Sequence, residues 1–100
     1  MTKKEYLLEC LAEEACEIAQ AKSKVIRFGE DNEWPGYNGT ALTRLCTEIN
    51  DFYGVLELLV EEIQAMKFYL PNRDEIEAKK RKVMDMMEYS RQRGIIKDTQ

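Results

Sequence analysis

The 100-residue sequence predicts an all-α protein, and three observations support this fold class. Apolar residues recur at the three- and four-residue spacing of a helix face, whereas no segment alternates with the period of two that a strand shows. Only five glycines and two prolines interrupt the chain. With 44% hydrophobic and 34% charged residues, the composition indicates a globular chain. We therefore expect a bundle of about three helices, with a modest core that a partner subunit completes.

The first helix is expected at residues 4–28, a stretch without glycine or proline that ends before Gly29. Its apolar face comprises Leu7, Leu8, Leu11, Ala15, Ile18, Val25 and Ile26. A loop is expected at residues 29–39, because this segment holds three of the five glycines and one of the two prolines.

The second helix is expected at residues 40–69 and the third at residues 73–93. Pro71 would stop the second helix, whose apolar face comprises Leu42, Leu45, Ile49, Phe52, Leu56, Leu59, Val60 and Ile63. Asn72 or Asp74 can cap the third helix, which fades at Gly94 into a short polar tail. We expect residues 1–100 to form a single domain.

Charge, apolar runs and cysteines restrict the function classes. The net charge of −4 argues against nucleic acid as the main partner. No apolar run approaches the roughly 20 residues of a membrane-spanning helix, and the first ten residues do not read as a secretory signal, so we expect a cytoplasmic protein without membrane contact. The odd number of cysteines without a CxxC spacing predicts reduced, buried thiols at Cys10, Cys16 and Cys46.

Acidic residues of the first helix occupy positions where apolar side chains belong. At about 100° per residue, Glu14 falls inside the apolar arc, beside Leu7 and Val25. Glu17 lies at the edge of this arc, and the three-residue spacing lets both carboxylates approach a common point.

The second helix repeats this arrangement. Glu48 falls deep in its apolar arc, between Val55 and Leu59, and Asp51 lies at the margin of the arc. The two acids again stand three residues apart. Each of the two helices therefore carries one acid within its apolar face and a second acid one turn further along.

Basic residues that would pair with these acids within the same helix are mostly missing. Glu14, Glu17 and Asp51 have no basic residue three or four positions away, and only Glu48 has one, Arg44. A half-buried carboxylate without compensation costs several kcal/mol, and a divalent cation would supply the compensation. Since the chain contains no histidine, an all-oxygen set favours Mg²⁺, with Mn²⁺ as a substitute. Unusual structural acids are the alternative interpretation.

Two motifs carry a resemblance to a known family. EEACE at residues 13–17, followed across the loop by EIND at residues 48–51, resembles the EExxE…ExxD signature of the all-α nucleoside triphosphate pyrophosphohydrolases. This superfamily includes MazG-like enzymes, dimeric all-α dUTPases, dCTP pyrophosphatases and phosphoribosyl-ATP pyrophosphohydrolases. The resemblance covers roughly residues 7–63.

The resemblance implies a MazG-like helical bundle completed in a homodimer or homotetramer, and Mg²⁺-dependent hydrolysis of a nucleoside triphosphate to a monophosphate and pyrophosphate. Glu14, Glu17, Glu48 and Asp51 correspond to the metal ligands of the motif. Glu13 is our candidate general base, and a solvated surface acid is the alternative for this residue.

Candidates for nucleotide contacts lie on the first helix, in the loop and on the third helix. Lys22 and Arg27 are candidate phosphate ligands, as are Lys79 and Lys82, although a snorkelling or solvated role is the alternative for these lysines. Trp34 could stack on a nucleobase or anchor the loop.

We expect an enzyme that acts on a (deoxy)nucleoside triphosphate in nucleotide-pool housecleaning. The alternatives are a phosphoribosyl-ATP pyrophosphohydrolase-like enzyme, and a non-catalytic helical interaction module that retains a cation site or binds no ligand. Mg²⁺-dependent pyrophosphate release separates these classes.

Overall fold

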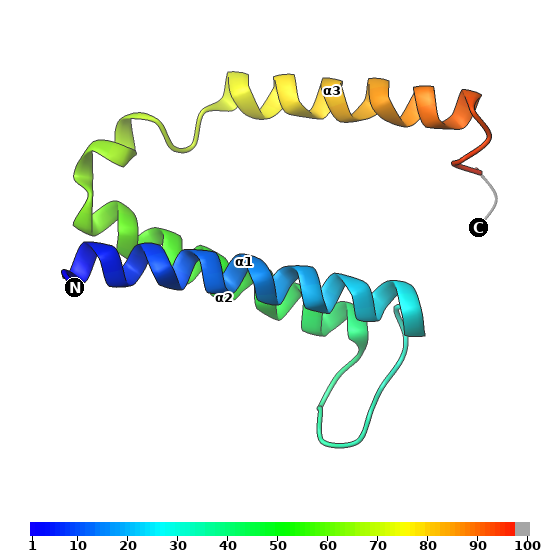
Figure 1. Ribbon diagram of the computed structural model, residues 1–100, viewed down its shortest axis with the longest axis horizontal. Coiled ribbons are helices and arrows are strands. Elements are labelled where there is room, and N and C mark those ends of the chain that lie inside the picture. The colour runs from blue at the N-terminus through cyan, green and yellow to red at the C-terminus, as the bar shows by residue number, and fades with distance from the viewer. Residues whose placement is uncertain (98–100) are drawn as a thin grey trace. The chain divides into compact units, whose positions relative to one another are not determined.

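The computed structural model describes residues 1–97 and confirms the all-α prediction, since it has no strand in that range. Its elements are α1 (Lys3–Phe28), α2 (Ala41–Glu62), the 3-10 helix η1 (Gln64–Phe68) and α3 (Arg73–Gln92), as labelled or coloured in Figure 1. The chain divides into two compact units, the first at Met1–Met66 and the second beginning at Lys67. The expected single domain stays a prediction, and residues 98–100 of the expected polar tail lie outside the described range.

Local side-chain and backbone groups define the ends of α1. Thr2 and Glu5 form a capping box, in which the Glu5 N–H donates to Thr2 Oγ1 at 3.1 Å. At the other end, the Gly29 N–H donates to the Val25 carbonyl at 2.9 Å, and Gly29 has a positive φ of 94°. The predicted first helix is therefore confirmed to within one residue at its start.

A second capping box starts α2. The Thr43 N–H donates to Thr40 Oγ1 at 3.2 Å, and the Thr40 N–H donates to Thr43 Oγ1 at 2.7 Å. Gly39 precedes this cap with a φ of 139°, and a Cβ atom there would lie only 2.6 Å from Thr43 Oγ1. The start of α2 therefore requires glycine at position 39.

The expected end of the second helix is wrong. Instead of continuing to Tyr69, α2 stops at Glu62, because Ile63 leaves the helical region at φ −112° and ψ 79°. A hydrogen bond of 2.9 Å from the Met66 N–H to the Ile63 carbonyl then begins the tighter 3-10 turn of η1. Such turns are common after helix C-termini, and no glycine or proline at residues 55–70 marks this one in the sequence.

The two long helices form an antiparallel hairpin. α1 and α2 pack side by side in Figure 1, and an ion pair of 3.4 Å joins Lys3 near the start of α1 to Glu62 at the end of α2. We call the faces that meet between them the seam. Its buried apolar residues are Leu7 and Ala21 on α1 and Ala41 and Leu59 on α2.

Acids occupy seam positions one heptad from these buried residues. Glu14 stands seven residues from both Leu7 and Ala21, and Glu48 stands seven residues after Ala41. In a helix pair, residues seven apart face the same partner, so both acids point into the seam. The angular prediction for Glu14 and Glu48 thus agrees with the observed packing.

The second unit contains α3, which buries none of its residues. Asn72 rather than Asp74 is the N-cap, since the Asn72 side chain accepts a hydrogen bond of 3.0 Å from the Glu75 N–H. Arg73 and Lys80 both pair with Glu77, at 2.6 and 3.4 Å. Glu77 is therefore paired locally, with basic residues of its own helix.

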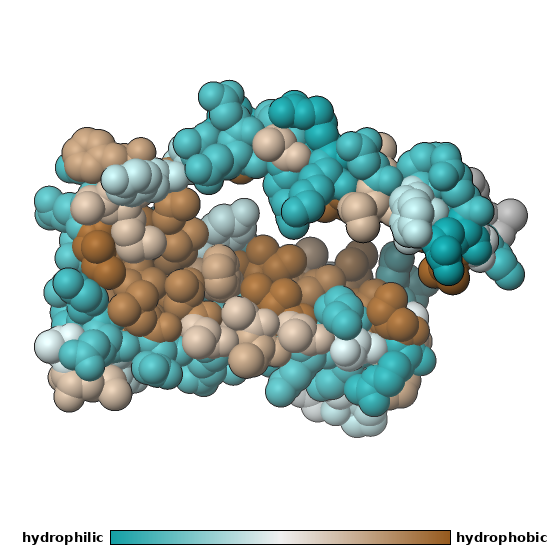
Figure 2. Space-filling view, turned by 45° about the horizontal axis from the view of Figure 1, so that its top comes forward, coloured by the Kyte–Doolittle hydropathy of each residue, from teal (hydrophilic) through white to brown (hydrophobic). Residues whose placement is uncertain are grey.

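Many large apolar residues of the hairpin are exposed. Figure 2 shows hydrophobic residues gathered along the length of the hairpin. The exposed apolar residues of α1 and α2 include Leu8, Ile26, Phe28, Leu42, Tyr53 and Leu58. Two helices bury one seam between them, so the remaining apolar surface has no partner within this unit.

The three cysteines are free, as predicted, but the expectation of burial is wrong for two of them. Cys16 and Cys46 are exposed, and Cys10 is half-buried. Each exposed cysteine stands two residues before or after a seam acid, about 200° around the helix, and so faces away from the seam. None of the described helices is long and apolar enough to cross a membrane. The expected cytoplasmic location stays a prediction.

Candidate metal centre

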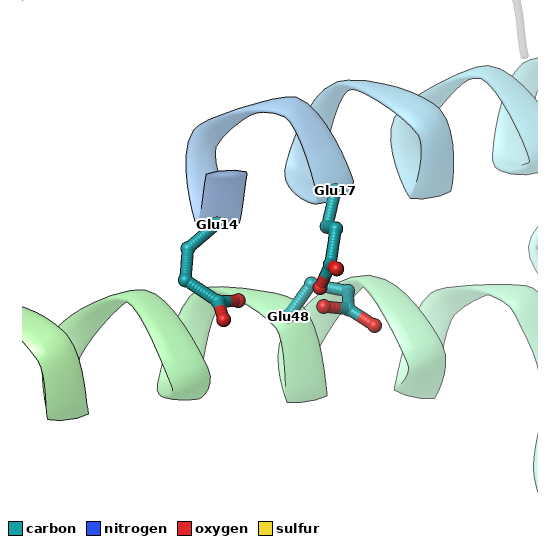
Figure 3. Close-up of side chains that lie close together, drawn as sticks. All are labelled: Glu14, Glu17 and Glu48. Atoms are coloured by element: carbon teal, nitrogen blue, oxygen red, sulfur yellow. The ribbon is translucent and has the colours of Figure 1, made fainter. Parts of the chain in front are cut away.

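Three carboxylates converge on the seam midway along the hairpin. Glu14 and Glu17 extend from α1 toward α2, and Glu48 extends from α2 to meet them (Figure 3). One oxygen from each residue lies within 4.8 Å of the others. The structure thus brings together three of the four predicted metal ligands.

Glu48 is the most enclosed member of this acid cluster, which we define as Glu14, Glu17 and Glu48. It is only 3% exposed, and it forms an ion pair with Arg44, in which Arg44 Nη2 lies 2.8 Å from Glu48 Oε1. Its Oε2 and the Oε2 of Glu14 are buried without a hydrogen-bond partner among the described residues. The cluster therefore contains two buried oxygens whose hydrogen-bonding capacity is unused by the described residues.

The surroundings favour the protonated form of Glu48. Burial raises the pKa of the Glu48 carboxyl above its ordinary value of 4.5, and a hydrogen bond with Glu17 and the negative charges of Glu17 and Asp51 act in the same direction. Arg44 opposes these effects by lowering the pKa. The guanidinium therefore offsets only part of the cost of holding negative charge here.

The donor set fits a hard divalent cation. Carboxylate oxygens are the ligands that Mg²⁺ and Mn²⁺ take in proteins, and the cluster supplies three carboxylates with two unpartnered buried oxygens. A cation would relieve the mutual repulsion of the carboxylates and satisfy these oxygens. Purely structural acids are the alternative interpretation of the same cluster.

Asp51 and Glu13 lie outside the cluster. Asp51 is exposed, although its charge acts on Glu48. Glu13 is also exposed and stands about 100° around α1 from Glu14. Their predicted roles as a metal ligand and as a general base stay predictions.

Basic residues gather on α1 between the acid cluster and the loop. Lys22 and Arg27 are exposed and, together with Lys24, line a surface hollow of about 550 Å³. Lys22 stands about 12 Å along the helix axis from Glu14, calculated from the rise per residue. The structure therefore places both predicted phosphate ligands of α1 in one hollow toward the loop.

Lys79 and Lys82 belong to the second unit. There they line a hollow of about 240 Å³, with apolar neighbours that include Val83 and Met86. All the residues that line this hollow belong to the second unit, whereas the acid cluster belongs to the first. The predicted contact of these lysines with a phosphate stays a prediction.

The loop places Trp34 in an aromatic stack. Its ring lies 4.9 Å from that of Tyr37 with an interplanar angle of 16°, and Lys24 Nζ lies 5.4 Å from the Trp34 centroid. Trp34 also lines a hollow of about 350 Å³ with Lys24, Phe28 and Asn32. Stacking within the loop agrees with the anchoring interpretation, and nucleobase stacking by Trp34 stays a prediction.

One contact at this site, between Arg44 and Tyr37, is not predicted by the sequence. The Arg44 Cζ lies 5.2 Å from the Tyr37 ring centroid while the same guanidinium pairs with Glu48. The four-residue spacing of Arg44 and Glu48 indicates their ion pair, but no sequence pattern predicts the contact of Arg44 with Tyr37 of the loop.

Comparison of the chain with protein-family models, with curated proteins and with solved structures finds no match. The molecule is thus defined as an all-α protein of three α-helices over the described residues, with a three-carboxylate cluster that could hold a cation. The resemblance to the pyrophosphohydrolases rests on the two acidic motifs.

Proposed function

We propose that the protein is a Mg²⁺-dependent nucleotide pyrophosphohydrolase that converts a (deoxy)nucleoside triphosphate to a monophosphate and pyrophosphate. The observation that carries this proposal is the convergence of Glu14, Glu17 and Glu48 within 4.8 Å, with a buried, unpartnered oxygen on Glu48. The same residues occupy the acidic positions of the EExxE…ExxD motif. Packing and motif thus support the same three ligands.

The acid cluster would hold the cation, and Asp51 lies close enough to add its charge. A bound Mg²⁺ would neutralise part of this charge and act as a Lewis acid toward the phosphate oxygens of a nucleotide. Without this neutralisation, the three carboxylates would repel a triphosphate. The residues of the cluster therefore suit a reaction on a polyanion only when a cation is bound.

The distribution of charge along the hairpin supports a phosphorylated substrate. Carboxylates lie midway along the seam, whereas Lys22, Lys24 and Arg27 follow toward the loop. Arg44 stands one turn from Glu48 in the same direction, because α1 and α2 are antiparallel. A nucleotide bound at the cluster would meet positive charge on the loop side, which favours phosphate over a neutral substrate.

The exposed apolar residues support self-association. Ile26 is 77% exposed and Tyr53 57% exposed, and both belong to the hairpin that carries the acid cluster. Large apolar residues exposed along one hairpin are typical of subunit interfaces. We include a homodimer or homotetramer in the proposal, and the mass measured by light scattering tests it: a monomer at micromolar concentration would contradict it.

The activity test is pyrophosphate release from a panel of nucleoside triphosphates with and without Mg²⁺. We expect release from at least one nucleotide, dependent on the metal. Glu14→Gln keeps the side-chain shape but removes a ligand charge, and we expect it to lower the rate at least about 100-fold.

Glu57→Gln is the control for this substitution. Glu57 is an exposed acid of α2, nine residues after Glu48 and therefore on the opposite side of the helix. We expect its rate to stay within about twofold of the wild type, as for a surface change without a role. Absence of turnover on every nucleotide would contradict the enzyme and favour a non-catalytic module.

A further inference from the structure

Arg44 connects the acid cluster to the loop between α1 and α2. Its Nη2 lies 2.8 Å from Glu48 Oε1, and its Cζ lies 5.2 Å from the centroid of the Tyr37 ring. One guanidinium therefore contacts a candidate cation ligand and a loop aromatic at the same time. Planar guanidinium groups stack well on aromatic rings, so both contacts favour the same orientation of the side chain.

The contacts continue from Tyr37 through the loop. Tyr37 stacks on Trp34 with a centroid separation of 4.9 Å, and Lys24 of α1 covers Trp34 at 5.4 Å. The backbone ties the same loop to α2, since the Ala41 N–H donates to the Asn32 carbonyl at 2.8 Å. A change at Arg44 would therefore reach the aromatic pair directly.

A cation at the acid cluster would compete with Arg44 for Glu48. The guanidinium and the cation both compensate the same carboxylate, which is 3% exposed and has its second oxygen buried without a partner. Two positive groups beside one carboxylate repel each other, and the divalent ion has the larger charge. Binding of the ion thus weakens the attraction between Arg44 and Glu48.

We propose that Arg44 is a positioning residue that couples cation binding at Glu48 to the arrangement of Tyr37 and Trp34 in the loop. This inference rests on the cation site of the proposed function. Without the cation, Arg44 pairs with Glu48 and holds Tyr37 beneath it. With the cation, Arg44 moves away from Glu48, and the aromatic pair rearranges with it. The metal site and the aromatic loop thus respond together.

Trp34 provides a direct readout, because it is the single tryptophan of the chain. We would titrate the 100-residue chain with MgCl₂ at constant ionic strength and follow tryptophan emission, and in parallel measure Mg²⁺ binding by calorimetry. In the wild type, we expect the emission to change with the same midpoint as binding. Glu48→Gln should bind Mg²⁺ at least about tenfold more weakly and lose the emission change.

Arg44→Gln removes the proposed link to the loop while it keeps the carboxylates of the cation site. Without a competing guanidinium, we expect Mg²⁺ to bind at a roughly three- to tenfold lower concentration while the emission no longer responds. Arg73→Gln is the matched control, since Arg73 also pairs with a glutamate four residues later but lies on α3. Its binding and emission should equal those of the wild type.

Tyr37→Leu provides a second variant that leaves the ion pair in place. We expect Mg²⁺ to bind with the wild-type midpoint, while most of the emission change is lost because the link from Arg44 to Trp34 is removed. A full emission response in either Arg44→Gln or Tyr37→Leu would overturn the coupling.

Two further results are distinguishable. If Mg²⁺ binds to the wild type but the emission stays constant, the coupling is wrong and the proposed cation site stands. If calorimetry detects no binding to the wild type, the cation site of the proposed function is wrong, and the coupling with it.

Discussion

Glu77 on α3 and the seam acids Glu14 and Glu17 of the hairpin differ in the charge that compensates them. On α3, Glu77 pairs with Arg73 and Lys80 of the same helix, at 2.6 and 3.4 Å. In the hairpin, Glu14 and Glu17 have no basic residue at helical spacing, and their carboxylates instead approach Glu48 of the neighbouring helix. Locally paired acids need no ligand, whereas converging acids leave charge that a cation can neutralise.

Burial differs between the two regions in the same way. The hairpin buries residues from both helices along its seam, including a carboxylate, whereas α3 buries none of its own. An acid becomes costly only where neighbouring side chains exclude water. The candidate site therefore coincides with the part of the molecule that has a core.

Leu59→Ala should produce the largest change in stability. Leu59 is fully buried in the seam, and its truncation removes apolar contacts and leaves a cavity. We expect a loss of about 3 kcal/mol in the free energy of unfolding, measured with urea. Val83→Ala on α3, where Val83 is 43% exposed, should cost less than about 0.5 kcal/mol. Equal losses would contradict the difference in packing between the regions.

Glu48→Gln should stabilise the metal-free protein at neutral pH. Burial raises the pKa of Glu48 in the folded protein above the ordinary value of 4.5. Deprotonation of Glu48 therefore lowers the stability of the folded protein as the pH rises from 4.5 through this higher pKa. Glutamine removes this cost. In the presence of a chelator, we expect the free energy of unfolding to rise by up to about 1 kcal/mol. The gain is small because only two helices enclose the site and water still screens it.

The pH dependence provides the control for this variant. Below the ordinary pKa of 4.5, both states of the wild type are protonated at this residue, so the difference between wild type and variant should disappear. A variant that is less stable than the wild type at neutral pH would indicate that Glu48 serves chiefly as a structural partner of Arg44.

Arg73→Gln should have the smallest effect. The pair with Glu77 is exposed on α3, and such helix pairs contribute about 0.3–0.5 kcal/mol. We expect a loss of this size in urea unfolding at low salt, and a smaller loss in 0.5 M NaCl because salt screens the charges. A larger, salt-independent loss would contradict the interpretation of Arg73–Glu77 as an exposed pair within one helix.

Periodicity predicted the features that depend on one helix face. It located α1 to within a residue, and it placed Glu14 and Glu48 among apolar neighbours, where the heptad positions confirm them. Asp51 shows the limit of helical periodicity, since this residue lies at the margin of the predicted apolar arc and is exposed in the packed hairpin. The angle alone does not tell which side of the margin the partner helix covers.

Features that depend on irregular backbone were not predictable. The helix break at Ile63 has no glycine or proline beside it, and the stack of Trp34, Tyr37 and Arg44 depends on loop dihedrals that no periodic pattern encodes. Arg44 was recognised as a partner of Glu48 by its spacing alone. Its second contact, with the loop, required the structure.

Calorimetric titration with Mg²⁺ tests the central claim, that the converging carboxylates form a cation site. Wild type, Glu48→Gln and Glu57→Gln would be compared after removal of metal with a chelator. We predict saturable binding by the wild type and by Glu57→Gln, and binding at least about tenfold weaker by Glu48→Gln. Binding by Glu48→Gln equal to that of the wild type, or no binding by the wild type, would contradict the claim.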